Sequence, residues 1–81
     1  MIEKKIQKKL ETNLKNAKIF IQDMTGNNDH FNLVAISDSF ENLSLIEQHR
    51  LIYSLLDGMV TKEIHALQLK TLTWAQWKKQ N

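Results

Sequence analysis

The chain has 81 residues, of which 42% are hydrophobic and 25% charged, with no cysteine, no proline and a formal net charge of +2. This composition is typical of one globular domain spanning residues 1–81, and the lack of cysteine excludes disulfides, a thiolate nucleophile and a metal site built from the chain's own thiolates. No apolar run approaches the ~20 residues of a membrane span, and no apolar segment of a signal peptide follows the basic start. We therefore expect a soluble, cytoplasmic protein without membrane attachment.

The charge is distributed unevenly along the chain. Residues 1–18 hold six lysines against two glutamates, residues 19–63 hold seven acids against one arginine and one lysine, and residues 64–81 add three lysines. The segment charges are therefore +4, −5 and +3. Two basic ends around an acidic middle give weak support for a nucleic-acid surface, which favours one continuous basic face.

The first elements follow from apolar spacing. Ile2, Ile6, Leu10 and Leu14 recur every four residues, which predicts an amphipathic helix of roughly 13 residues whose lysines lie on the solvated side. Residues 17–23 and 30–36 alternate as strands do, and the Gly, Asn and Asp residues between them predict a turn. These features predict a hairpin.

A helix is expected from Ser44 to about Leu56. Ser44 with Glu47 three residues later forms a capping-box pattern. Its apolar residues at helical spacing are expected to form a stripe that faces the core. His49 is expected to pack within this stripe or at its edge. The stripe comprises Leu45, His49, Ile52 and Leu56, with Ile46 and Tyr53 beside it.

Asp57 and Gly58 end this helix, and residues 59–63 form at most one further helical turn. Residues 64–71 alternate as a strand, and Thr73 begins a short last helix. The predicted fold is α+β, a three-stranded sheet with helices packed on one face. Its order is helix, strand, strand, helix, short helix, strand, with the last helix following.

The residues point to binding rather than to catalysis. No serine lies in a recognisable nucleophile motif, and no pair of carboxylates marks a site, so we expect a protein that is not an enzyme. His30 and His65 begin the second and third strands, and sheet geometry could place both at one end. Each has two interpretations. His65 is a core residue or a metal ligand, and His30 is a solvent-facing loop residue or a second ligand.

A helix-turn-helix is the second hypothesis. Residues 45–56, the turn at 57–58 and residues 59–63 have its outline, with Arg50 and Lys62 as nucleic-acid contacts. The would-be recognition helix is short and carries one basic residue, whereas a working one needs several side chains that reach base edges. Gly26 and Gly58 are isolated, so the Gly-x-x-Gly loop of KH domains is absent.

Several motifs in order resemble the BolA-like proteins, over about residues 5–78, and most of all the short bacterial type similar to IbaG. The motifs are Val34-Ala35-Ile36-Ser37-Asp38-Ser39-Phe40-Glu41, Leu45, Gln48-His49-Arg50-Leu51-Ile52-Tyr53, Ile64-His65-Ala66-Leu67, Lys70-Thr71-Leu72-Thr73 and Trp77. The resemblance implies a fold similar to type II KH domains without the Gly-x-x-Gly loop.

The resemblance also implies a partner, a monothiol glutaredoxin of the Cys-Gly-Phe-Ser type, in a heterodimer that shares a [2Fe–2S] cluster. The glutaredoxin cysteine and a glutathione thiolate would hold one side, and His65 of the Ile-His-Ala motif the other, with His30 of the hairpin as the auxiliary ligand. Mixed imidazole and thiolate ligation is known for such clusters. Arg50 and Lys70 are expected partner contacts, and the isolated chain is expected to bind no cluster and to be a monomer or weak homodimer.

The alternative function that the resemblance implies is a DNA-binding transcriptional regulator of the stress response, acting through the helix-turn-helix-like segment with Arg50 and Lys62. Three residues depart from the family pattern. Asn42 stands where glycine is usual and alters a turn, and Trp74 replaces a common proline. Gln48 stands where arginine is frequent, which we expect to remove a positive charge from the nucleic-acid face.

Overall fold

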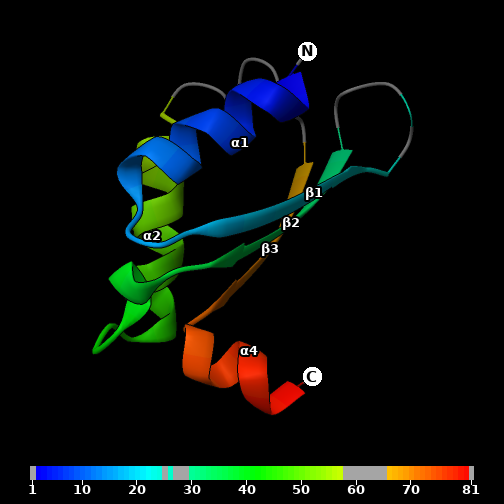
Figure 1. Cartoon of the computed structure of the whole chain (residues 1–81). Coiled ribbons are helices and arrows are strands. Elements are labelled where there is room, and N and C mark those ends of the chain that lie inside the picture. The colour runs from blue at the N-terminus through cyan, green and yellow to red at the C-terminus, as the bar shows by residue number, and fades with distance from the viewer. Residues whose placement is uncertain (1, 25, 27–29, 58–65, 81) are drawn as a thin grey trace.

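The computed structural model describes residues 2–24, 26, 30–57 and 66–80. Figure 1 shows its helices and strands. In chain order they are α1 (Ile2–Asn13), β1 (Lys18–Asp23), β2 (His30–Ile36), the 3₁₀ turn η1 (Asp38–Phe40), α2 (Leu45–Leu55), β3 (Ala66–Leu72) and α4 (Trp74–Gln80). The predicted first helix, three strands, middle helix and last helix are confirmed, with ends that differ by one or two residues. The predicted helical turn at residues 59–63 lies outside the described residues.

The three strands form one mixed sheet in the order β1-β2-β3. β1 pairs with β2 antiparallel, as a hairpin does, with Phe20 opposite Val34. β3 pairs with β2 in parallel, so that His30 is opposite Ala66 and Ile36 opposite Leu72. A parallel pair requires a crossover connection, and α2 lies in the segment that provides it.

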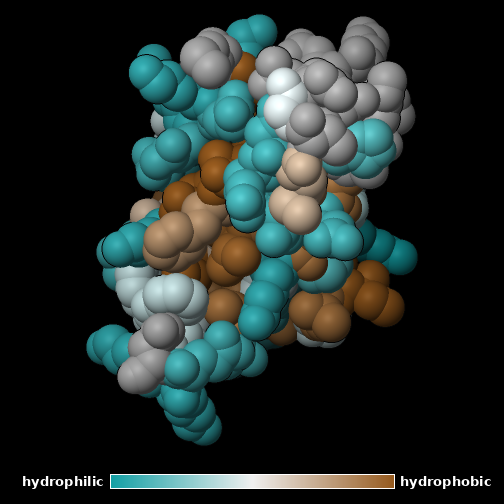
Figure 2. All heavy atoms as spheres, turned by 90° about the vertical axis from the view of Figure 1, so that its right-hand side faces the viewer, coloured by the Kyte–Doolittle hydropathy of each residue, from teal (hydrophilic) through white to brown (hydrophobic). Residues whose placement is uncertain are grey.

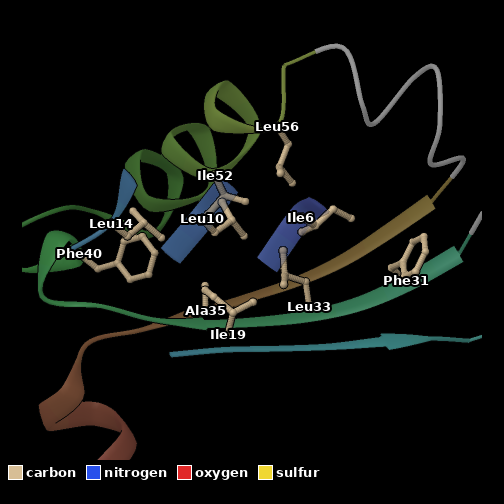
Figure 3. Packing of buried hydrophobic residues seen from close by; sticks show 10 residues of the cluster. All are labelled: Ile6, Leu10, Leu14, Ile19, Phe31, Leu33, Ala35, Phe40, Ile52 and Leu56. Carbon is tan, nitrogen blue, oxygen red and sulfur yellow. The ribbon is translucent and has the colours of Figure 1, made fainter. Parts of the chain in front are cut away.

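One face of the sheet is covered by α1 and α2 (Figure 3). Alternate residues of β2 point toward these helices and are fully buried, because successive side chains of a strand point to opposite faces. The close-up shows the helix side chains and the strand side chains meeting in one layer. The buried cluster comprises Ile6, Leu10, Leu14, Ile19, Phe31, Leu33, Ala35, Phe40, Ile52 and Leu56.

The C-terminal helix α4 reaches the other face. The ring centroids of Trp77 and Phe20 are 5.5 Å apart, and Phe20 alternates with the buried Ile19, so its side chain points away from α1 and α2. Trp74 Nε1 donates a hydrogen bond to the backbone carbonyl of Asn16 at 2.6 Å. The predicted layer of helices on one face is thus formed by α1 and α2, while α4 packs at the opposite side.

Ser37 joins the turn after α1 to the end of β2. Its side chain is fully buried, and its Oγ donates to the carbonyl of Lys15 at 2.6 Å and accepts from the backbone N–H of Ser39 at 3.0 Å. The Oγ of Ser39 in turn accepts from the backbone N–H of Lys15 at 2.9 Å. Because a buried hydroxyl is costly unless it is hydrogen-bonded, these contacts explain why serine is tolerated in the core.

Helix α2 begins with the predicted capping box. Ser44 Oγ accepts from the backbone N–H of Glu47, and the Glu47 carboxylate accepts from the backbone N–H of Ser44. The predicted buried stripe, however, is wrong at its first residue, because Leu45 is 62% exposed. Ile46 and Tyr53 are also exposed. The inward stripe instead begins at Gln48 and continues through Ile52 to Leu56.

The amide of Gln48 explains why a polar residue faces inward. Its Oε1 accepts from Thr71 Oγ1 at 2.6 Å, and its Nε2 donates to the carbonyls of Leu43 and Phe40 at 3.0 and 3.4 Å. Gln48 and Thr71 are both buried. A buried amide with its donors and acceptor satisfied costs little, and here it ties α2 to β3 and to the segment before α2.

The Gln48–Thr71 contact makes a prediction about stability. Thr71→Val keeps the shape of the side chain but leaves Gln48 Oε1 buried without its donor, so the free energy of unfolding should fall by about 1–3 kcal/mol. Thr12→Val is the matched control, because Thr12 is exposed on α1 and should change stability little. Urea unfolding followed by circular dichroism measures both, and equal midpoints for the two variants would contradict a stabilising role for this contact.

None of the described helices is long and apolar enough to cross a membrane.

Candidate metal-ligand site at one end of the sheet

His30 is the first residue of β2, and its backbone is held on both sides. Its carbonyl accepts a hydrogen bond from the backbone N–H of Met24 at 2.8 Å, which closes the hairpin next to the turn. Gly26 lies in this turn with a φ of 79°, a left-handed conformation that glycine adopts without strain, and its N–H donates to Asp23 Oδ1 at 2.9 Å. His30 is therefore held at the strand end by this hydrogen bond and by the pairing of β2 with β3.

The side chain of His30 is exposed, whereas the next residue, Phe31, is 1% exposed and packs in the core. Strand alternation then places His30 on the face of the sheet away from α1 and α2. An exposed imidazole at the start of a strand is a suitable metal ligand.

The parallel register connects His30 with the Ile64-His65-Ala66 motif. Ala66 is the Cα partner of His30, and His65 precedes Ala66 by one peptide bond in the sequence. His65 itself lies outside the described residues, so its role remains a prediction. The register nevertheless agrees with the expectation that the second and third strands begin at the same end of the sheet.

The donor atoms limit what this end of the sheet could bind. Within residues 2–24, 26, 30–57 and 66–80, no three His, Cys, Asp or Glu side chains come together as a metal site. The whole chain has three histidines and no cysteine. One or two imidazoles fit part of the ligand set of a [2Fe–2S] cluster, as in centres where histidine replaces cysteine on one iron, but the thiolates must come from another molecule.

The expected partner contacts do not form one surface with each other. Arg50 is exposed on α2, two residues after the inward-facing Gln48, so it points away from the sheet. Lys70 is exposed on β3 next to the inward-facing Thr71, so it points away from α2 on the opposite side. Lys70 is also four residues, or roughly 13 Å, from Ala66 at the strand end.

The nucleic-acid residues of the second hypothesis are only partly visible. Arg50 is exposed on α2, and Lys62 lies outside the described residues. Beside Arg50 on α2 lie the exposed Ile46, Tyr53 and the acidic Glu47, and Leu45 is exposed further around the helix. A helix surface with one arginine and three large apolar groups differs from the basic surface expected at a DNA backbone.

Comparison with known proteins decides the family. The sequence model of the family described as BolA-like protein matches residues 4–76. The chain belongs to the BolA-like family. The resemblance carried by the sequence motifs is therefore confirmed, and the matching family is not one of enzymes.

Relatives with names and structures agree with this assignment. A protein of Haemophilus influenzae named "DNA-binding transcriptional regulator BolA" is 34% identical over 84 aligned positions that cover 100% of this chain and 82% of that protein. BolA1 from Arabidopsis thaliana has a TM-score of 0.83 at 28% identity, covering 90% of this chain and 92% of that one. The BolA domain of SufE1 from the same plant has a TM-score of 0.80 at 35% identity, covering 89% and 91%. The predicted α+β fold is confirmed.

The departures of this BolA-like chain from the family pattern now have structural explanations. Gln48 is buried against Thr71, so the expectation that it removes a charge from a nucleic-acid face is wrong. Asn42 has a φ of 64°, a conformation that favours glycine and that asparagine tolerates better than most residues. Trp74, which had no assigned role, ties α4 to Asn16.

The sequence also contains a helix-start signal before α4, which we did not predict. Thr73 N–H donates to Gln76 Oε1 at 2.9 Å, and Thr73 Oγ1 accepts from the backbone N–H of Gln76 at 3.2 Å. This is a second capping box, which the spacing of Thr73 and Gln76 signals. It fixes the start of α4, and so places Trp77 against Phe20.

The first capping box makes the stability of the BolA-like domain depend on pH. Hydrogen bonds from the backbone N–H and then the side chain of Ser44 hold the pKa of Glu47 below its ordinary value of 4.5, with a smaller contribution from Arg50. Since the folded pKa is the lower one, Glu47 stabilises the fold fully above the unfolded pKa, and this stabilisation disappears as pH falls through the folded pKa.

We expect Glu47→Gln to remove this part of the pH dependence. Its effect on the midpoint of urea unfolding should be present at pH 7 and should shrink as the pH is lowered from 5 to 3. Glu41→Gln is the control, because Glu41 is exposed and lies outside both capping boxes. A difference between wild type and Glu47→Gln that stays constant from pH 7 to pH 3 would show that the carboxylate charge contributes nothing.

Proposed function

We propose that this BolA-like protein is a non-enzymatic adaptor that pairs with a Cys-Gly-Phe-Ser monothiol glutaredoxin and contributes histidine ligation to a shared [2Fe–2S] cluster. The observation that supports it best is the parallel register of β2 and β3, in which His30 is opposite Ala66 of the Ile-His-Ala motif. Such a register brings the beginnings of the two histidine-bearing segments to one end of the sheet.

The ligand chemistry supports sharing rather than binding by the chain alone. A [2Fe–2S] cluster takes four protein or thiol ligands, and this chain has no cysteine to offer. In the proposal, His65 is the main ligand and His30 the auxiliary one, while the glutaredoxin cysteine and glutathione supply the thiolates. Replacing thiolate by imidazole on one iron raises the reduction potential, which suits iron or redox sensing as well as cluster transfer.

The shared cluster can be tested by anaerobic reconstitution. The chain, a Cys-Gly-Phe-Ser glutaredoxin, glutathione, iron and sulfide are mixed and followed by visible circular dichroism. We expect a spectrum that differs from that of the glutaredoxin homodimer and is lost with His65→Ala. His30→Ala should weaken or shift it, because it removes only the auxiliary ligand.

His49→Gln is the matched control, since it removes the third imidazole from α2 rather than from the sheet. Far-ultraviolet circular dichroism checks that each variant is folded. The adaptor proposal fails if the mixture gives the glutaredoxin spectrum unchanged, or if His65→Ala and His49→Gln alter the spectrum equally.

A second function, DNA binding as a transcriptional regulator, is favoured by the name of the Haemophilus influenzae relative. In that proposal the surface is the helix-turn-helix-like segment with Arg50 and Lys62. Affinity for a duplex should then fall steeply with salt, and Arg50→Gln and Lys62→Gln should each lower the salt slope by about 0.9. Fluorescence anisotropy with a labelled duplex measures this, and slopes unaffected by both substitutions would reject the segment as the DNA contact.

A further inference from the structure

On the face of the sheet away from α1 and α2, side chains of neighbouring strands line up in rows that run across the sheet. The register places Gln22 opposite Asn32 and Asn32 opposite Gln68, so three amides cross the three strands side by side. Within the described part of the chain, these side-chain amides make no hydrogen bond. The row therefore offers donors and acceptors to an outside molecule.

The neighbouring row is apolar and basic. It consists of Phe20, Val34 and Lys70, which are also Cα partners across the sheet. Phe20 is 41% exposed although Trp77 lies against its ring. Figure 2, which looks at the side of the molecule that is on the right in Figure 1, shows hydrophobic surface bordered by hydrophilic side chains.

The charge of this face has one sign. Lys18 begins the outer row of β1, with its Nζ 5.4 Å from the centre of the Phe20 ring, and Lys70 lies on β3. The outward positions of the three described strands contain no aspartate or glutamate, and α4 adds Lys78 and Lys79 without an acid. Lys18 on β1 and Lys70 on β3 thus flank the outer positions of β2, which carry no acid, and the partner that complements them is a polyanion.

We infer that this outer sheet face binds single-stranded RNA. A flat sheet does not enter the groove of a duplex as a helix does, whereas unpaired bases stack on exposed aromatic side chains of a sheet and present their edges to polar groups. Phe20 supplies the stacking position, where a base takes the place of Lys18 Nζ, which lies 5.4 Å from the ring centre and turns to a phosphate. The amide row of Gln22, Asn32 and Gln68 supplies hydrogen bonds. Lys18 and Lys70, one on each edge strand, contact the phosphates.

The polar groups of this face fit an RNA strand better than a DNA strand. Among the described residues, the face carries the exposed Phe20 ring, the His30 imidazole at its end and three amides that both donate and accept. A ribose 2′-hydroxyl also donates and accepts, so an RNA strand gives the amides partners that a DNA strand lacks. This surface lies on the side of the sheet away from α2, which carries Arg50, and the inference uses neither Arg50 nor Lys62.

The test is fluorescence anisotropy of a labelled ten-nucleotide RNA of mixed sequence with the full chain. Lys18→Gln with Lys70→Gln should weaken binding on the order of tenfold at low salt and lower the salt slope by about 1.4, since each neutralised phosphate on a single strand contributes about 0.7. Phe20→Leu keeps an apolar contact for Trp77 but removes the stacking ring, and should also weaken binding on the order of tenfold.

Lys8→Gln with Lys9→Gln is the matched control, because it removes the same charge from exposed positions of α1 on the other layer. Thermal unfolding checks that all variants are folded. The inference stands if the control binds like wild type and if single-stranded DNA and duplex RNA of the same sequence bind several-fold more weakly. Equal loss in the control, equal duplex binding or tighter DNA binding would each overturn it.

Discussion

The parallel pairing of β2 with β3 is the constraint on which most of the structure depends. Parallel strands cannot be joined by a tight turn, so the chain must leave the sheet after Ile36 and return at Ala66, and α2 is built in that crossover. The same register determines which side chains become neighbours on both faces. It places Thr71 beneath Gln48 on one face, and it aligns Asn32 with Gln68 on the other.

Buried polar contacts hold the elements in this arrangement. Ser37 fastens the end of β2 to the turn after α1, and Gln48 fastens α2 to β3. Each is buried with its hydrogen-bonding groups satisfied, so each adds directional contacts to a core that is otherwise apolar. In a domain of 81 residues, where burial is modest, such contacts specify one packing of the helices on the sheet.

Local sequence patterns predicted the positions of the helices and strands well. They predicted the contacts between distant parts of the chain poorly. Alternation identified β2 from His30 to Ile36, and the capping box identified the start of α2. Leu45 was misplaced because a helical stripe read from hydrophobicity alone counts leucine as buried and glutamine as exposed. Gln48 is buried instead, because its hydrogen-bond partners come from other parts of the chain. These partners are Thr71 and the carbonyls of Phe40 and Leu43.

The candidate ligand site was predictable only in part for the same reason. The sequence places His30 and His65 at the beginnings of strands, but only the register shows that β2 and β3 begin together. The row of amides was also present in the sequence, as one asparagine or glutamine at an outward position of each strand. Its meaning depends on how three strands are aligned, which alternation within one strand does not contain.

The auxiliary ligand His30 and the amide row lie on one face of the sheet. His30 points to the same side as Asn32, and the two side chains are separated by two residues along β2, or roughly 7 Å. A partner protein that covers the ligand end therefore borders the amide row directly. If it extends past that row, it excludes a nucleic-acid strand from the outer face, and loading of the cluster and binding of RNA become mutually exclusive. Such competition would let the presence of the glutaredoxin partner control the outer face of the sheet without any change in the fold, because the linkage is steric and both ligands contact neighbouring outward positions of β2.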